Sequence, residues 1–163
     1  MRTDKLTTWQ ARLDASRREL LTLLEGLTPD QWQAPAFSDG DTWTVTTVVA
    51  HLAENERGMS IHVHKIRKGE ETIPPDFDLT RWNAGVKERS GDPTPADLFA
   101  LLANTRTRVL DVMASLKAED WARTGRHPSR GLITIEQYYE TMSDHERTHA
   151  QDIRTALGLN TAG

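Results

Sequence analysis

Four segments of the chain repeat apolar side chains at spacings of three and four residues, the pattern of a helix that buries one face. They cover about residues 4–24, 44–69, 95–116 and 134–157. No strand-like alternation competes with them, and 163 residues are enough for one domain with a full hydrophobic core. The sequence therefore predicts an all-α fold, a four-helix bundle formed by a single domain over residues 1–163.

The ends of these segments carry residues that start and stop helices. Thr44 and Thr134 stand where an N-cap is expected, and Pro95 suits a first helical turn. Gly158 follows the last segment, where a glycine commonly ends a helix. These residues support the four predicted helices and place their boundaries.

A long connection, about residues 70–93, joins the second helix to the third. Part of it could form one short helix, and connections of this length are usually functional or mobile. We expect Trp82 and Asn83 within it to cover one end of the bundle.

A weak repeat relates the two halves of the chain. The first helix ends in LLEGLTPDQW and the third in VMASLKAEDW, which places Trp32 level with Trp121. About a dozen residues later each half starts a new helix, and there Glu56 is level with Glu146. Two explanations remain open. The similarity could be chance, together with the residue preferences that all helices share, or the chain could form two helical hairpins that face each other across a pseudo-twofold axis.

Three histidines fall on faces that should point into the bundle. His145 and His149 continue the apolar stripe of the fourth helix, and residues four apart lie one above the other. His51 lies on or beside the apolar stripe of the second helix. If these two helices are neighbours, the three imidazoles converge.

A buried polar group without a partner costs about 1–3 kcal/mol, so three such groups in one layer need something to join them. A divalent cation does this, and three protein ligands leave a coordination position open, as in reactive metal sites. The alternative is that each histidine is an ordinary hydrogen-bonded core residue, held by neighbours such as Asp144, Glu146 or Asp152.

The stretch HERTH matches H-E-x-x-H, the zinc signature of many metalloproteases, in which Glu146 would be the catalytic base. Only 14 residues follow His149, and none of them is Glu or His. The usual downstream third ligand is therefore missing, which argues against a protease. Glu146 could instead be a surface charge paired with an arginine such as Arg57.

Several other residues could take part in chemistry near such a metal. Tyr138 lies on the apolar stripe and could place its hydroxyl near the metal. We expect that its neighbour Tyr139 cannot face inward as well. His62 could line the same cavity. His127 lies in a predicted loop before the fourth helix and could reach a substrate, although a loop histidine is usually just exposed.

Two arginines of the same loop, Arg126 and Arg130, could bind an anionic cosubstrate. Most arginines in such a position are ordinary surface charges.

The composition of the chain limits the classes of partner that the protein is expected to bind. The net charge of −4 gives no sign of a nucleic-acid surface, which would be basic. No apolar run approaches the length of a membrane span, and the N-terminal segment lacks the apolar stretch of a signal peptide. Cysteine is absent, which removes disulfides and thiolate ligands. We expect a cytoplasmic protein that binds small molecules, but neither nucleic acid nor membranes.

The stretches TWTVTTVVAHLAENE and DHERTHAQDIRTALG, in this order and spacing, resemble the DinB-like superfamily. Its members include metal-binding four-helix bundles and the mycothiol-dependent maleylpyruvate isomerase. The resemblance implies a bundle with an unusual helix order that holds a divalent metal, often zinc or nickel. Its three ligands would be His51, His145 and His149. Isomerase-like members have a glutamate at the position of His145, so this chain looks closer to the three-histidine branch.

Some relatives transfer low-molecular-weight thiols to electrophiles, and homodimers are frequent among them. The resemblance thus implies a metal-dependent transferase. Because the chain has no cysteine, the activated thiol would be a cosubstrate, with Glu146 or Tyr138 as candidates for proton transfer. Two other classes stay open: a metal-binding or stress-associated bundle without turnover, and a metal-dependent hydrolase.

Overall fold

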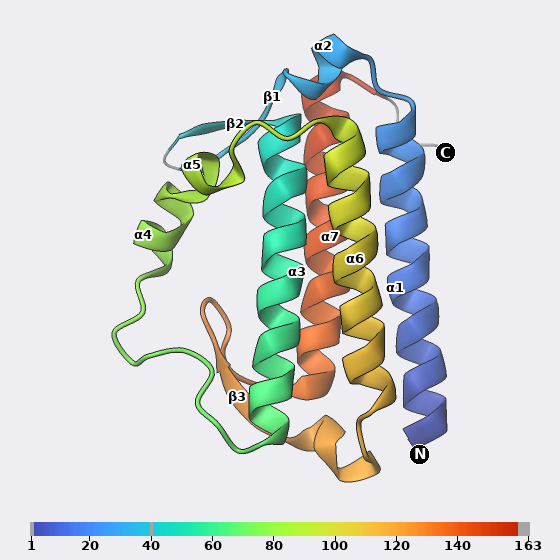
Figure 1. Ribbon diagram of the computed structural model, residues 1–163, viewed down its shortest axis with the longest axis vertical. Coiled ribbons are helices and arrows are strands. Elements are labelled where there is room, and N and C mark those ends of the chain that lie inside the picture. The colour runs from blue at the N-terminus through green and yellow to red at the C-terminus, as the bar shows by residue number, and fades with distance from the viewer. Residues whose placement is uncertain (1, 40, 160–163) are drawn as a thin grey trace.

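The computed structural model describes residues 2–39 and 41–159, and four long helices dominate it (Figure 1). These are α1 (Arg2–Glu25), α3 (Val45–Arg67), α6 (Pro95–Ala114) and α7 (Ile135–Leu157). The predicted four-helix bundle is confirmed, with helix boundaries close to the expected ones. Residues 1, 40 and 160–163 of the expected domain lie outside the described residues.

The order of helix directions is unusual for a bundle with short connections. In Figure 1, α1 and α7 run upward while α3 and α6 run downward. The long connection climbs beside α3 and returns the chain to the top, so that α3 and α6 are parallel. We expected one short helix in this connection, and the structure has two, α4 (Leu79–Ala84) and α5 (Val86–Ser90).

Local hydrogen bonds account for the helix boundaries. The Thr44 hydroxyl accepts a hydrogen bond from Thr47 N at 3.3 Å at the start of α3. At the start of α7, Thr134 and Gln137 form a reciprocal capping box with distances of 3.1 and 2.8 Å. Gly158 ends α7 in the left-handed conformation, with a φ of 67°, which a residue without a Cβ adopts at little cost.

Two short β-hairpins precede α3 and α7, and the sequence did not predict them. The strands are β1 (Pro35–Ser38) paired with β2 (Thr42–Thr44), and β3 (Thr124–His127) paired with β4 (Gly131–Thr134). A strand of three or four residues is too short for an alternating pattern to stand out. A single-turn helix, α2 (Pro29–Trp32), or a 3-10 helix, η1 (Ala118–Ala122), leads into each hairpin.

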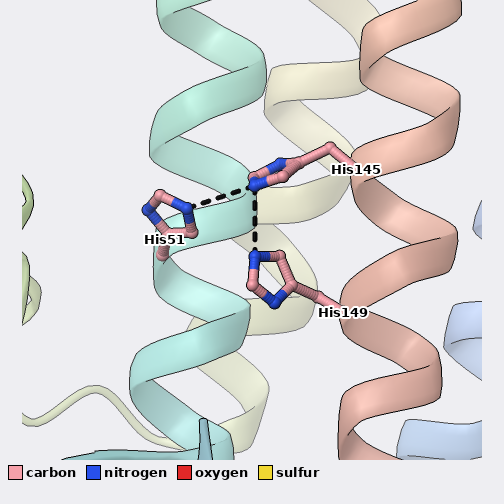
Figure 2. Close-up of side chains that lie close together, drawn as sticks. All are labelled: His51, His145 and His149. Atoms are coloured by element: carbon pink, nitrogen blue, oxygen red, sulfur yellow. Dashed lines mark hydrogen bonds between the residues drawn. The ribbon is translucent and has the colours of Figure 1, made fainter. Parts of the chain in front are cut away.

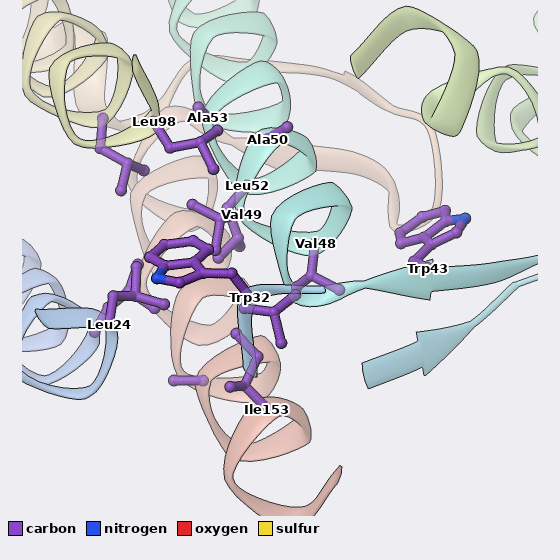
Figure 3. Packing of buried hydrophobic residues seen from close by; sticks show 14 of the residues in the cluster. Leu24, Trp32, Trp43, Val48, Val49, Ala50, Leu52, Ala53, Leu98 and Ile153 are labelled. Carbon is purple, nitrogen blue, oxygen red and sulfur yellow. The ribbon is translucent and has the colours of Figure 1, made fainter. Parts of the chain in front are cut away.

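The apolar core has two parts, one toward each end of the bundle. Figure 3 shows the first, where Trp32 packs among Leu24, Val49 and neighbouring residues of α3 and α6. The second includes Tyr138 and Tyr139. The expectation that only one of these two tyrosines faces inward is wrong, because both are buried and Tyr139 packs on Trp121 with ring centroids 5.6 Å apart. Helix α7 has neighbours on more than one side, namely α1, α3 and η1, so it buries more than one stripe.

Two arginines and two glutamates occupy the middle of the bundle, one from each long helix. Arg17 of α1 donates hydrogen bonds from Nη2 to Glu56 Oε2 at 2.8 Å and to Glu146 Oε2 at 3.2 Å. Arg106 of α6 donates from Nε to Glu56 Oε1 at 2.7 Å and from Nη2 to Glu146 Oε2 at 3.0 Å. All four residues are buried. We call this group the Arg–Glu quartet.

The contacts of the quartet are reciprocal. Arg17 Nη1 donates to the carbonyl oxygen of Leu102 at 2.9 Å, and Arg106 Nη1 donates to that of Leu13 at 2.7 Å. The two arginines stand 89 positions apart, as do the two leucines (106 − 17 and 102 − 13). Of the two explanations of the repeat, the structure supports two helical hairpins related by a pseudo-twofold axis.

Candidate metal centre

His51 of α3 meets His145 and His149 of α7 between the two helices (Figure 2). The Nε2 atom of His145 lies 3.3 Å from that of His51 and 3.1 Å from that of His149. Each residue offers one ring nitrogen, and these three atoms all lie within 4.8 Å of one another. The convergence expected from the helix faces is therefore present. We call these residues the histidine cluster.

Aromatic side chains from the first hairpin hold two of these rings in place. Phe37 of β1 packs edge-on against His149, with ring centroids 4.9 Å apart, and Trp43 of β2 packs against His51 at 5.0 Å. Both histidines are buried, with 7% of His51 and 5% of His149 exposed. The hairpin thus excludes water from one side of the cluster.

The electrostatic environment keeps the three imidazoles neutral. Burial, with the neighbouring His149 and Arg89, lowers the pKa of His51 to about 4. Burial and the other histidines lower the pKa of His145 to about 2. Burial also lowers the pKa of His149, and Asp152 opposes that change. A neutral imidazole keeps one nitrogen lone pair, which is the form that binds a metal ion.

The geometry fits a divalent cation. Two nitrogens that bind zinc at about 2.0–2.1 Å with tetrahedral angles lie about 3.3–3.4 Å apart, and the observed separations of 3.3 and 3.1 Å are close to this. His149 Nδ1 lies 3.0 Å from Asp152 Oδ2, although the two atoms are not aligned as an ideal hydrogen bond. A carboxylate in this position favours a proton on Nδ1 and leaves the Nε2 lone pair for the metal.

A cavity of about 430 Å³ opens beside the cluster, and His51 and His145 form part of its wall. The rest of the wall comes from α3, from α7, from the long connection and from the second hairpin. The lining includes Asn55, Met59, Ile61, His62, Lys65, Ile73, Phe77, Trp82, Asn83, His127 and Thr141. The cavity is large enough for a small molecule. The expectation that Trp82 and Asn83 cover one end of the bundle is wrong, because they lie in α4, beside α3, where they line this cavity.

The structure places Glu146 away from this cavity, although it is the neighbour of His145 in the sequence. Both carboxylate oxygens accept hydrogen bonds in the Arg–Glu quartet. Burial raises the pKa of Glu146, and the guanidinium groups of Arg17 and Arg106 oppose that rise. Its ion-pair partners are these two arginines, not Arg57.

Tyr138 also lies outside the histidine cluster. Its hydroxyl donates a hydrogen bond to the carbonyl oxygen of Arg126 at 2.7 Å, and burial raises its pKa. The ring packs between His62 and His127, with centroid distances of 5.9 and 5.5 Å. Tyr138 therefore helps to attach the second hairpin to α7.

His127 is the residue that sequence reasoning placed least well. It was expected on an exposed loop, but it ends strand β3 and only 8% of it is exposed.

The two arginines of the second hairpin have contacts of their own within the protein. The side chain of Arg130 donates a hydrogen bond to Thr141 Oγ1 at 2.6 Å. Arg126 is exposed and contributes a backbone carbonyl oxygen to Tyr138.

Residues 12–153 match the family described as the DinB superfamily. The chain belongs to the DinB superfamily. Among curated proteins, no sequence is similar enough to count as a match.

Solved structures with the same fold include a Bacillus subtilis protein, YfiT, described as a probable metal-dependent hydrolase with an unusual four-helix bundle topology. It shares 27% identity with this chain, with a TM-score of 0.71 over 95% of this chain and 89% of YfiT.

Two further neighbours are below 25% identity and bear on the fold alone. The mycothiol-dependent maleylpyruvate isomerase is 18% identical, with a TM-score of 0.72 over 94% of this chain and 60% of the isomerase. The colibactin self-resistance protein ClbS, solved with double-stranded DNA, is 14% identical, with a TM-score of 0.72 over 96% of this chain and 97% of ClbS.

Within residues 2–39 and 41–159, no helix is both long and apolar enough to span a membrane.

Proposed function

We propose that the protein binds one divalent cation through His51, His145 and His149 and uses it to transfer a low-molecular-weight thiol to an electrophile. The observation that carries this proposal is the separation of 3.1–3.3 Å between neutral imidazole nitrogens at one end of a small-molecule cavity. Zinc and nickel are the expected ions, because both accept imidazole nitrogen.

A divalent cation held by His51, His145 and His149 would supply Lewis acidity, which would lower the pKa of a thiol or water and make it a better nucleophile. The protein chain contributes the surroundings of that reaction. The histidines bring three ring nitrogens within 4.8 Å of one another, Phe37 and Trp43 exclude water from one side, and the apolar part of the cavity would hold the substrate.

The charges lining the cavity favour a thiol over water as the nucleophile. Water activation for hydrolysis usually uses a free carboxylate or histidine as general base. Glu54 is the one acidic residue of the described cavity lining, and it forms an ion pair with Arg89 at 2.9 Å. A thiol has an ordinary pKa near 8.5, far below that of water, so it needs less help to lose its proton.

Metal-dependent hydrolysis is the second candidate, favoured by the similarity to YfiT. The chain would then need His62 as its general base, because Glu146 is bonded to arginines in the quartet and the Nδ1 lone pair of His127 accepts backbone hydrogen bonds. A bundle that binds metal without turnover is the third. A homodimer and the absence of nucleic-acid binding remain predictions from the resemblance and the net charge.

An activity screen with the metal-loaded protein tests the proposal. Purified protein is incubated with a thiol and an electrophile, and the rate is compared among wild type, His149→Ala and the control His64→Ala. His64 lies on the same helix as His51 but bonds to Arg67 and does not line the cavity. We expect His149→Ala to lose both metal and rate, and His64→Ala to keep both.

If His149→Ala keeps its metal and its rate, the ligand assignment is wrong. If the wild type hydrolyses an ester or amide, with no thiol-dependent transfer, the second candidate replaces the first.

A further inference from the structure

The end of the cavity away from the histidine cluster carries a second group of polar side chains. His62 and Lys65 of α3 line this end together with His127 of the second hairpin. None of them belongs to the three-histidine group that could hold a metal. These three side chains are not ligands of the proposed metal, so we ask what else they could bind.

The hydrogen bonds around His127 identify its tautomer. Its Nδ1 atom accepts hydrogen bonds from the backbone N–H groups of Ser129 at 3.1 Å and Arg130 at 3.2 Å. Because a backbone N–H can only donate, Nδ1 has no proton, and the neutral ring carries its proton on Nε2. No described residue accepts a hydrogen bond from that Nε2–H. His127 therefore presents a fixed donor at the cavity wall.

The other two residues also lack partners within the described part of the chain. The Nδ1 atom of His62 is buried without a hydrogen bond. The ammonium group of Lys65, one turn further along α3, forms no ion pair with any described acidic residue. One positive charge and one neutral donor at a concave surface suit an acceptor group that carries negative charge.

The spacing along the helices separates this end from the metal site. At 1.5 Å per residue, Tyr138 lies ~10 Å along α7 from His145, and His62 lies ~16 Å along α3 from His51. A ligand that reaches both ends is therefore longer than a simple two- or three-carbon thiol.

We propose that Lys65 and His127 form a carboxylate-binding subsite, so that the substrate is an elongated thiol with an apolar middle and a carboxylate at its far end. This proposal rests on the proposed function, which places the thiol of the substrate at the metal. The apolar middle would lie against Met59, Ile73 and Phe77, which line the cavity.

Matched probes test this subsite by calorimetry on the zinc-loaded protein. The probes are 8-mercaptooctanoate and 8-mercaptooctanol, which differ at the far end, and the short pair 3-mercaptopropionate and 3-mercaptopropanol. A charge-assisted hydrogen bond gives about tenfold in affinity. We expect 8-mercaptooctanoate to bind about tenfold more tightly than 8-mercaptooctanol, and the short pair to show no such preference.

Substitutions of single residues show which side chains cause the preference for the carboxylate probe. Lys65→Met removes the charge at a half-buried position, and His127→Phe keeps a ring in the buried position without the donor. Each should reduce the preference for the long carboxylate several-fold without lowering the zinc content. Lys68→Met is the matched control, because Lys68 is exposed on the same helix end and does not line the cavity.

Equal affinity of the two long probes in the wild type would overturn the subsite. So would a preference that survives both Lys65→Met and His127→Phe, since the carboxylate would then bind elsewhere, at the metal or at Arg57, which also lines the cavity. A preference abolished by Lys68→Met would also overturn it, because the effect would be one of net charge.

Cobalt-substituted protein separates the two proposals. A change in the visible absorption of cobalt on adding either long probe reports the thiol at the metal end, whereas calorimetry reports the far end. An absorption change with equal affinities supports the thiol site and rejects the subsite. A carboxylate preference that depends on Lys65, without any absorption change, supports the subsite and rejects the thiol site.

Discussion

The bundle buries two polar clusters a short distance apart, and they are built in opposite ways. In the Arg–Glu quartet, positive and negative groups from four helices satisfy one another, and two backbone carbonyl oxygens take further arginine donors. In the histidine cluster, three neutral nitrogens face one another, so each close contact can have at most one donor. The first cluster is complete within the protein, while the second has no opposite charge within it, and we propose that a divalent cation completes it.

The comparison shows how a buried polar residue can be assigned to structure or to ligand binding. His145 and Glu146 are adjacent in the sequence, yet one lines the cavity and the other joins the quartet. About 100° of helix rotation separates them. The role of a buried polar residue is predicted better by whether its bonding partners lie within the protein than by its chemical type.

The largest expected effect comes from removing one member of the quartet. Arg106→Ala leaves Glu56 and Glu146 with one guanidinium between them, and breaking a buried ion cluster in this way costs about 3–5 kcal/mol. Urea denaturation should show this loss in the free energy of unfolding. Arg108→Ala, at an exposed position of the same helix, should stay within about 0.5 kcal/mol of wild type. A loss below about 1 kcal/mol in Arg106→Ala would contradict the structural role of the quartet.

The next largest effect is the stabilisation of the folded protein by zinc. At a free zinc concentration 100 times the dissociation constant, binding to the native state alone adds about 2.7 kcal/mol to the free energy of unfolding. We expect this gain in wild type and in His64→Ala, and no gain in His149→Ala, measured by thermal or urea unfolding with and without the ion. An equal gain in His149→Ala would place the ion elsewhere.

A smaller effect should follow from the carboxylate beside His149. Asp152→Asn removes the charge that orients this ring, and loss of such a partner typically weakens metal binding 10–100-fold. Competition with a chelator would measure the change in zinc affinity. The exposed Asp144→Asn serves as the control. An unchanged affinity in Asp152→Asn would show that the ring orientation depends on packing against Phe37 instead.

The smallest effect concerns pH and His127. Burial, together with His62 and Arg130, lowers the pKa of His127 to about 4, below the value near 6.5 expected in the unfolded chain. Between these values the unfolded chain binds a proton that the folded protein excludes, so stability falls as pH falls from about 6.5 toward 4. Solvent that reaches part of the ring reduces the slope below the full 1.4 kcal/mol or so per pH unit.

Urea unfolding of the metal-free protein between pH 7 and pH 4.5 would measure this slope. We expect a shallower decline in His127→Phe than in wild type, with the two slopes equal above pH 7. Parallel curves throughout the range would show that His127 does not titrate as its burial implies.

Much of the fold follows from local patterns, and the structure confirms it. Thr44, Thr134 and Gly158 mark the helix ends because capping depends on neighbours within a few residues. The faces of His145 and His149 follow from the helical period, since their separation is one turn. These features need no knowledge of distant contacts.

The features that the sequence left open depend on distant contacts. The partners of Glu146 are Arg17 and Arg106, which lie 129 and 40 residues away on helices whose rotation no local pattern determines. His127 is buried because a hairpin folds back onto Tyr138, and strands of four residues give too short an alternation to predict that hairpin. The repeat placed Glu56 level with Glu146, and the structure shows that both glutamates join the quartet.

X-ray absorption spectroscopy at the zinc edge of the metal-loaded protein tests the central claim most directly. We predict one zinc per chain with three imidazole nitrogens at about 2.0–2.1 Å, and fewer than three in His51→Ala. A first shell without three imidazoles in the wild type, or an unchanged shell in His51→Ala, would contradict the three-histidine metal centre.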